Sequence, residues 1–120
     1  MINQLIKTLK FNEAGLIPAI AQDATSKDVL MLAWMNQQAL QKTLETGQVY
    51  YYSRSRQALW RKGESSGHTQ ELVELRYDCD ADAILLLIKQ IGPACHTNRP
   101  NCFFNALRDG KNLIIDNPIA

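Results

Sequence analysis

The chain has 120 residues, of which 46% are hydrophobic and 21% charged, so it can form one domain with its own core but not two. Its formal net charge of +1 provides no overall field that would attract nucleic acid or a membrane surface. An odd number of cysteines, no secretion signal and no apolar run of membrane-spanning length together predict a cytoplasmic protein with reduced thiols.

The first third of the chain predicts a short helix and two strands. Residues 1–12 are loosely amphipathic, as a short helix would be. The apolar run 15–21 contains Pro18, which has no N–H to donate and therefore favours an edge strand over a central one. Residues 24–28 have the composition of a turn, and residues 29–34 predict a second short apolar strand.

The clearest helix is predicted over residues 36–46. Asn36 suits the N-cap position, and Met35 before it can pack on Leu40 as a hydrophobic staple. Gly47 supplies a left-handed stop after the last turn. Because most of its side chains are polar, we expect this helix to lie on the surface of a sheet.

Residues 48–68 combine strand-forming residues with many polar donors. The stretch 48–53 contains three consecutive tyrosines and predicts a strand. Residues 53–68 hold four cationic residues and four serines, which fit either a hairpin with a solvated basic face or a phosphate site. Gly63 and Gly67 would let the backbone approach a ligand closely. The candidate phosphate ligands are Arg54, Arg56, Arg61 and Lys62.

Two strands are predicted in the second half of the chain. Residues 69–78 alternate in polarity, with Val73, Leu75 and Tyr77 on one face, as in a half-buried strand. Residues 83–91 form a second, apolar strand, which a Gly-Pro turn ends.

These elements together predict an α+β fold in which strands predominate and one surface helix is clear. No linker, repeat or low-complexity segment divides the chain, so we expect residues 1–120 to form a single domain. The tail over residues 109–120 contains turn residues and one apolar patch, and it carries no chemical signal.

The strongest chemical signal is the acidic segment 78–82. If this segment is extended, its three carboxylates (Asp78, Asp80 and Asp82) share one face and the intervening Cys79 points to the other. Like charges side by side repel unless a cation lies among them, and hard oxygen ligands suit Mg²⁺, Mn²⁺ or Ca²⁺. The alternative is a solvated turn or strand end without a metal.

Cys79 also belongs to a second pattern with Cys95 and Cys102, spaced C-x15-C-x6-C. Three thiolates with one coordination position left over would make an open zinc site of the catalytic kind. The alternative is that the three cysteines are small buried residues of an intracellular protein.

Six short motifs follow one another in register along residues 15–103. They are Trp34-Met35-Asn36, Tyr52-Ser53-Arg54-Ser55-Arg56, Leu59-Trp60-Arg61-Lys62-Gly63-Glu64, Ser66-Gly67-His68, Asp78-Cys79-Asp80-Ala81-Asp82 and Ala94-Cys95-His96-Thr97. Together they resemble the phosphoribosyl-AMP cyclohydrolase family, which performs the third step of histidine biosynthesis. Some members of that family carry a fused phosphoribosyl-ATP pyrophosphatase domain, which this chain is too short to contain.

The resemblance implies a metalloenzyme that binds zinc and magnesium. The implied zinc ligands are Cys79, Cys95 and Cys102, and the implied magnesium ligands are Asp78, Asp80 and Asp82. It also implies a cytoplasmic, intertwined homodimer whose zinc site takes cysteines from both subunits. The expected partners are a small nucleotide substrate and a second copy of the chain, with no nucleic acid and no membrane.

The loop between the last two cysteines departs from the family pattern at two positions. This chain has Asn98 where the family usually has Gly, and Asn101 where it usually has Ser. Both changes keep the cysteines in place. If the Gly position requires a positive φ, Asn tolerates that conformation moderately well.

The implied reaction can be argued from the substrate. A ribosyl phosphate on N1 of adenine makes C6 electrophilic, so water can add at C6 and the N1–C6 bond can break. A zinc site would lower the pKa of a bound water, and Mg²⁺ would neutralise or orient a substrate phosphate. His96, next to Cys95, and His68, in the glycine loop, are the only histidines, and either can shuttle the proton to N1. Alone, each would be a hydrogen-bonded structural residue.

Two other classes of zinc protein fit the sequence less well. A zinc nucleobase deaminase attacks the same carbon of adenine but should show a Pro-Cys-x-x-Cys motif, and no Cys-x-x-Cys occurs here. A structural zinc module should have four ligands in paired short spacings, whereas three widely spaced cysteines are present. The balanced charge also disfavours a nucleic-acid partner.

Overall fold

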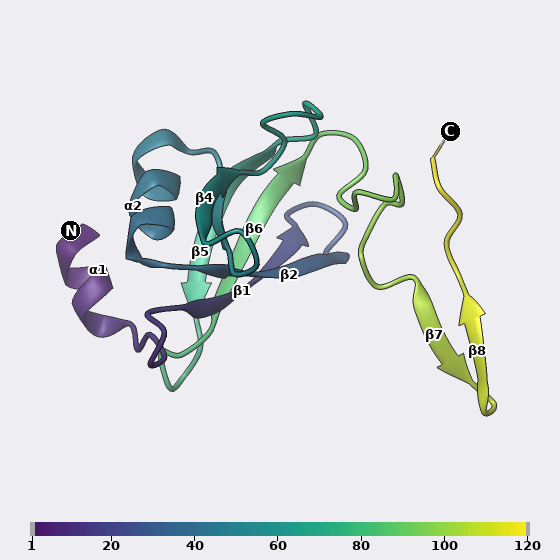
Figure 1. Ribbon diagram of the computed structural model, residues 1–120, viewed down its shortest axis with the longest axis horizontal. Coiled ribbons are helices and arrows are strands. Elements are labelled where there is room, and N and C mark those ends of the chain that lie inside the picture. The colour runs from purple at the N-terminus through teal and green to yellow at the C-terminus, as the bar shows by residue number, and fades with distance from the viewer. Residues whose placement is uncertain (1, 120) are drawn as a thin grey trace.

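The computed structural model describes residues 2–119, which form two helices and eight strands (Figure 1). In chain order these are α1 (Ile2–Thr8), β1 (Ile17–Asp23), β2 (Val29–Met35), α2 (Gln37–Thr46), β3 (Tyr50–Ser53), β4 (Ala58–Arg61), β5 (Gln70–Tyr77), β6 (Ile84–Gln90), β7 (Asn105–Arg108) and β8 (Lys111–Ile114). The predicted α+β class, with strands predominating, is confirmed. Neither described helix is long and apolar enough to cross a membrane.

The main sheet has the strand order β2-β1-β6-β5. β6 pairs in parallel with β1 and antiparallel with β5, so it lies inside the sheet, and most of its side chains are buried. Helix α2 and the hairpin β3–β4 contact each other and complete the core, and α1 packs on α2 (Figure 1). The largest fully buried side chains include Tyr51, Ile17, Met35, Leu40 and Leu86.

The prediction that the strand containing Pro18 lies at a sheet edge is wrong. β1 lies between β2 and β6, and Pro18 is opposite Trp34 of β2. The pairing of β1 with β6 begins only at Ala19, opposite Ile84. Pro18 therefore lies beyond the start of β6, and its missing N–H removes no hydrogen bond from that pairing.

The prediction of which β5 side chains are buried is also wrong in part. A bulge between Leu72 and Glu74 breaks the register with β6 and leaves Val73 62% exposed. One extra residue in a strand moves the following side chains to the opposite face, so Leu72 and Leu75 both pack against the core. Tyr77, predicted to share the buried face, is 47% exposed.

Helix α2 has the predicted start and stop. The Asn36 Oδ1 atom accepts a hydrogen bond from the N–H of Ala39 at 2.8 Å. Gly47 adopts φ 77° and donates its N–H to the carbonyl of Thr43. These local signals suffice because both caps involve only residues within four positions of each other.

Replacing Asn36 with Ala is expected to lower the free energy of unfolding by about 1 kcal/mol, because the N–H of Ala39 loses its acceptor. Asn36→Asp keeps a side-chain oxygen at the same place and should retain most of the stability. Urea unfolding followed by tryptophan fluorescence measures both variants. An unchanged free energy of unfolding in Asn36→Ala would show that the cap contributes nothing.

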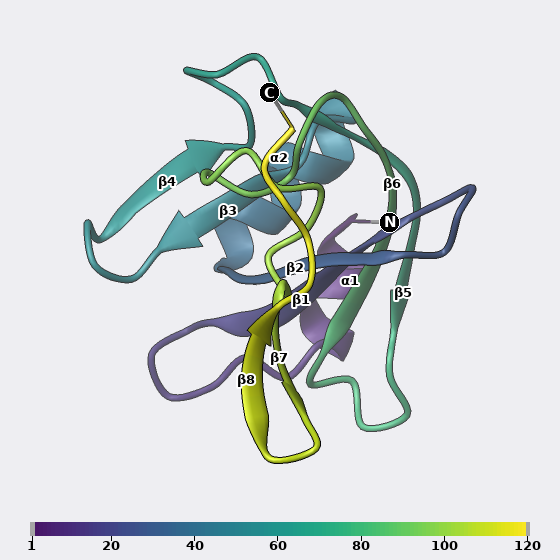
Figure 2. The same ribbon diagram turned by 90° about the vertical axis from the view of Figure 1, so that its right-hand side faces the viewer.

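The hairpin β7–β8 stands apart from the main sheet in Figure 1 and lies in front of it in Figure 2. We call residues 103–119 the C-terminal arm. Its apolar side chains remain in water, with Phe103 53%, Leu107 73% and Ile114 61% exposed. Within residues 2–119, the arm pairs with no strand of the main sheet. The arm contacts the cysteine loop, where Asn98 accepts the N–H of Ile119 and Arg99 donates to the carbonyl of Asp116, and these contacts leave most of its large apolar side chains exposed.

Candidate active site

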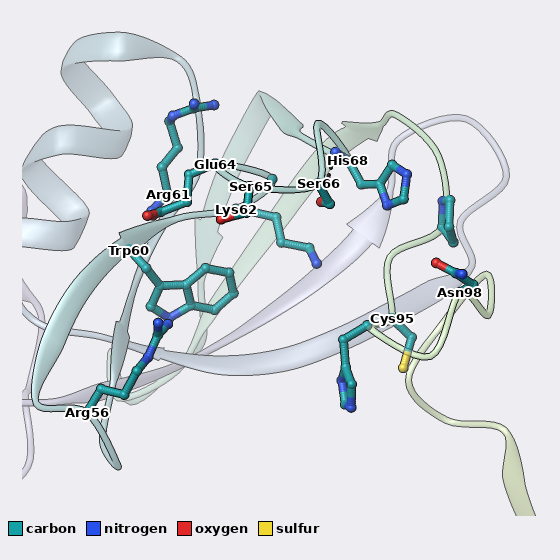
Figure 3. Close-up of a pocket in the computed structure, with 13 residues that line it drawn as sticks. Arg56, Trp60, Arg61, Lys62, Glu64, Ser65, Ser66, His68, Cys95 and Asn98 are labelled. Carbon is teal, nitrogen blue, oxygen red and sulfur yellow. Dashed lines mark hydrogen bonds between the residues drawn. The ribbon is translucent and has the colours of Figure 1, made fainter.

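A pocket of about 280 Å³ lies where the hairpin β3–β4, the glycine loop 62–68 and the loop after β6 meet (Figure 3). The side chains that matter for its chemistry are Arg56, Trp60, Lys62, His68, Cys95 and His96. These residues come from segments up to 40 positions apart in the sequence, so only the folded chain brings them together. The pocket is lined by cations, imidazoles and a thiol on its polar side and by an indole on its apolar side.

Both histidines singled out in the sequence line this pocket. His68 donates its backbone N–H to Ser66 Oγ at 3.1 Å, which closes the end of the glycine loop. His96 directly follows Cys95 in the loop after β6. Two imidazoles on separate segments can therefore face one bound molecule.

The four cationic candidates divide into two groups. Arg56, Arg61 and Lys62 line the pocket. The guanidinium of Arg54 instead lies 4.8 Å from the ring centroid of Trp34, over the face of the indole. Three of the four are therefore near any phosphate that enters the pocket.

Lys62 connects the hairpin to the cysteine loop. Its Nζ atom donates to the carbonyl of Ala94 at 2.6 Å and lies 5.9 Å from the ring centroid of Trp60 (Figure 3). Burial lowers the pKa of Lys62, while the thiols of Cys102 and Cys95 oppose that shift. A cation is thus placed beside two thiols.

Cys95 and Cys102 are neighbours in the fold. Burial by itself raises the pKa of Cys95, but hydrogen bonds from the hydroxyl and amide of Thr97 outweigh it and leave the pKa lowered. The Thr97 hydroxyl lies 3.1 Å from the sulfur of Cys95. Burial of the Cys102 thiol is the main cause that raises its pKa to about 11, and the nearby Cys95 adds to the increase. Part of Cys102 stays exposed.

The loop between these cysteines accommodates both departures from the family pattern. Asn98 has φ 64°, so this position does require the left-handed conformation that a glycine would adopt freely. Its N–H donates to the carbonyl of Cys95 at 3.0 Å. Asn101 Oδ1 accepts the N–H of Phe103 at 2.8 Å, a turn contact that a serine hydroxyl can also make.

The acidic segment is a turn between β5 and β6 and is not extended. Ala81 has φ 59°, and its N–H donates to the carbonyl of Asp78 at 3.0 Å. Slight desolvation raises the pKa of Asp78, but N–H groups led by that of Asp82 outweigh it and lower the pKa. A hydrogen bond to Asp78 and its negative charge raise the pKa of Asp82. The strict alternation expected of an extended segment is therefore absent.

Cys79 lies in this turn, away from the other two cysteines. The turn precedes β6, and Cys95 lies beyond the far end of this strand of seven residues. At about 3.3 Å per residue the strand alone separates the two regions by roughly 20 Å. Within residues 2–119, no three His, Cys, Asp or Glu side chains of one chain converge closely enough to hold a metal ion.

Three residues that contact each other or His68 behind the pocket are not among the predicted site residues. Gln70 and Gln90 are linked by a hydrogen bond of 2.9 Å, and Gly92 lies directly against the ring of His68. A glutamine in a strand and a glycine before a proline carry no local signal of such roles. They are recognised only from the contacts in the folded chain.

Comparisons with known proteins place this arrangement in a family. Residues 31–104 match the family model described as phosphoribosyl-AMP cyclohydrolase. The phosphoribosyl-AMP cyclohydrolase of Ruegeria sp. is 63% identical over 114 residues, covering 95% of this chain and 88% of the relative. That of Roseobacter denitrificans is 65% identical over 110 residues (92% and 86%), and the phosphoribosyl-AMP cyclohydrolase 2 of Pseudomonas fluorescens is 60% identical over 118 residues (98% and 80%).

Proposed function

Because the chain belongs to the phosphoribosyl-AMP cyclohydrolase family, we propose that the pocket beside the cysteine loop is where it opens the adenine ring of phosphoribosyl-AMP. The chain is a hydrolase that acts at the third step of histidine biosynthesis. The observation that carries the location is the convergence of two imidazoles, a thiol and three cations on one cavity. The relatives lend no support to the alternatives of a nucleobase deaminase and a structural zinc module.

The reaction needs water at C6 and a proton at N1. Water adds to C6, the N1–C6 bond breaks, and N1 takes a proton as it leaves. We assign proton transfer from the attacking water to N1 to His96 or His68, both of which line the pocket. Trp60 offers an apolar face for the purine, and Arg56, Arg61 and Lys62 offer positive charge for the phosphates.

The side chains in and beside the pocket supply some of the ligands that a zinc ion needs. Cys95 and Cys102 are adjacent thiols, one with a lowered pKa, and thiolate is a preferred zinc ligand. Zinc held there would supply a water of lowered pKa near C6. Each chain contributes only two of the three cysteines at this place, because its own Cys79 lies roughly 20 Å away along β6.

A second copy of the chain accounts for the missing ligand. We propose an intertwined homodimer in which Cys79 of the partner subunit completes the zinc site. The C-terminal arm supports this arrangement, because side chains such as Leu107 and Ile114 are more than half exposed and would be buried against another chain. Three free thiols also agree with a reducing, cytoplasmic location.

The acidic turn would accompany Cys79 into the shared site. Asp78, Asp80 and Asp82 would then supply oxygen ligands for Mg²⁺ close to the substrate phosphates. Their exposure in the single chain supports this role, because no side-chain cation of the described residues forms an ion pair with them. Together with their hydrogen bond, the negative charge of Asp78 raises the pKa of Asp82, and a bound divalent cation would relieve this repulsion.

An absorbance-monitored assay tests the function directly. Zinc-loaded, Mg²⁺-supplemented protein should convert phosphoribosyl-AMP. His96→Ala and His68→Ala should each lower kcat, by roughly 10²- to 10⁴-fold for the residue that transfers the proton. If both variants keep near-normal turnover, neither histidine transfers the proton. If the loaded and folded protein leaves the substrate untouched, the enzymatic assignment itself is wrong.

A further inference from the structure

Two glycines, Gly63 and Gly92, lie directly against His68. A Cβ atom added to Gly63 would lie 2.6 Å from the carbonyl carbon of His68, and one added to Gly92 would lie 2.6 Å from its ring atom Cδ2. The Gly92 Cβ would also lie 3.1 Å from Cγ and from Nε2 of the imidazole. Separations this short are incompatible with packed atoms. The ring of His68 therefore occupies the space that a side chain at position 92 would fill.

A buried chain of hydrogen bonds ends at the backbone of the same residue. The Tyr51 hydroxyl donates to Gln70 Oε1 at 2.6 Å, and Gln70 Nε2 donates to Gln90 Oε1 at 2.9 Å. Gln90 Nε2 then donates to the carbonyls of Ile91 at 3.1 Å and His68 at 3.4 Å. Tyr51 and Gln70 are fully buried. Reversing the Gln70 amide would place its oxygen against Gln90 Oε1, and reversing the Gln90 amide would place nitrogen against nitrogen, so each orientation fixes the next.

We propose that Gly92 is a positioning residue for His68, and that the chain from Tyr51 to Gln90 holds the backbone from which the imidazole projects into the pocket. The ring rests on the bare backbone of Gly92 and is kept in one orientation before substrate arrives. Proton transfer depends on such pre-set geometry, since a shift of about 1 Å can lower the rate about a hundredfold. The kinetic consequence rests on the proposed function; the position of the ring does not.

Imidazole proton–nitrogen NMR spectra of the substrate-free protein test the position of the ring. The chain has two histidines, so the His68→Ala spectrum assigns both signals. Gly92→Ala and Gly92→Asn should both move the His68 signals and leave those of His96 in place, because each introduces a Cβ. Asn tolerates the positive φ of 71° at this position, so a shift in both variants reports the added Cβ and not backbone strain.

Gly15 provides the matched control. It has φ 76° and nothing within 4 Å of an added Cβ, so Gly15→Ala introduces the same backbone strain without a contact. Gly15→Ala should leave the His68 signals and kcat unchanged. Gly92→Ala should lower kcat about tenfold to a hundredfold with little change in KM, since it displaces a reacting group and removes no binding contact.

A double-mutant cycle separates positioning from a general structural effect. If Gly92 acts through His68, Gly92→Ala should have no further effect on kcat in a His68→Ala background. Additive losses in kcat or unmoved His68 signals in the Gly92 variants would each overturn the inference, and so would normal kcat despite moved signals if His68→Ala itself lowers kcat. If the Gly92 variants fail to fold, Gln90→Leu should still move the His68 signals, and unchanged signals there would overturn it as well. Normal turnover of His68→Ala would assign proton transfer to His96 and remove the kinetic consequence, whereas the NMR shift would still decide whether Gly92 positions the ring of His68.

Discussion

Removing zinc with a tight chelator is expected to abolish ring opening, with a loss of roughly a thousandfold or more, and adding zinc back should restore it. The expected loss is this large because the reaction adds water at C6, and without the metal only the histidines of the pocket are left to activate that water. Mg²⁺ added alone to the stripped protein should not restore turnover, because a site of thiolates selects the softer ion. Circular dichroism would confirm that the stripped protein remains folded.

The affinity of the protein for zinc is expected to depend on pH. The thiol of Cys102 has a pKa raised to about 11, so it is protonated at neutral pH and must release its proton when zinc binds. Zinc affinity should therefore rise with pH and fall as the solution becomes more acidic, throughout the range below that pKa. Titrations with a competing chelator at several pH values measure this. A zinc affinity independent of pH, or turnover by protein shown to be free of metal, would contradict a thiolate site.

Mixing two inactive cysteine variants is expected to restore activity. Cys79→Ser and Cys95→Ser should each be inactive alone, because every zinc site lacks one thiolate. In a mixed dimer, one site combines Cys95 and Cys102 of the first variant with Cys79 of the second, and this site is intact. Random pairing makes half of the dimers mixed, so co-expression should recover about a quarter of the original specific activity.

The chain provides a strict control for this complementation. Cys95→Ser and Cys102→Ser remove ligands that lie together in the same chain, so their mixed dimers contain no intact site and should stay inactive. Recovery in the first mixture and not in the second would demonstrate a site shared between subunits. Failure of both mixtures, with dimers shown to have exchanged subunits, would exclude it.

Local patterns in the sequence were sufficient where the physical cause is local. Helix α2 begins at Asn36 and ends at Gly47 as predicted, because its caps join residues three or four positions apart. The motifs of residues 34–97 likewise indicate the family, and the comparisons confirm it. The identity of the metal ligands stays a prediction, since residue types indicate which ion is suited and not where the side chains meet.

Predictions failed where the outcome depended on a neighbouring strand. Pro18 belongs to an internal strand because β6 pairs with β1 on the side away from β2. The buried side chains of β5 are set by a bulge at Val73 in its pairing with β6. Both outcomes depend on pairing with β6, which the residues next to Pro18 and Val73 in the sequence do not encode. The acidic segment also departs from the extended form, because the carboxylate of Asp78 accepts the N–H groups of Asp82 and Ala83 and so closes a turn.

The class of fold, the capped helix and the family could be predicted from the sequence, whereas the roles assigned to the site residues stay predictions. The tertiary structure alone decided their arrangement: His68, Lys62 and Cys95 share one pocket, whereas Cys79 lies at the opposite end of β6. The reason is that spacing along a chain does not set distance across a sheet, where strand order and register place side chains. The contact between Gly92 and the ring of His68 is the clearest case, since 24 positions separate the two residues in the sequence.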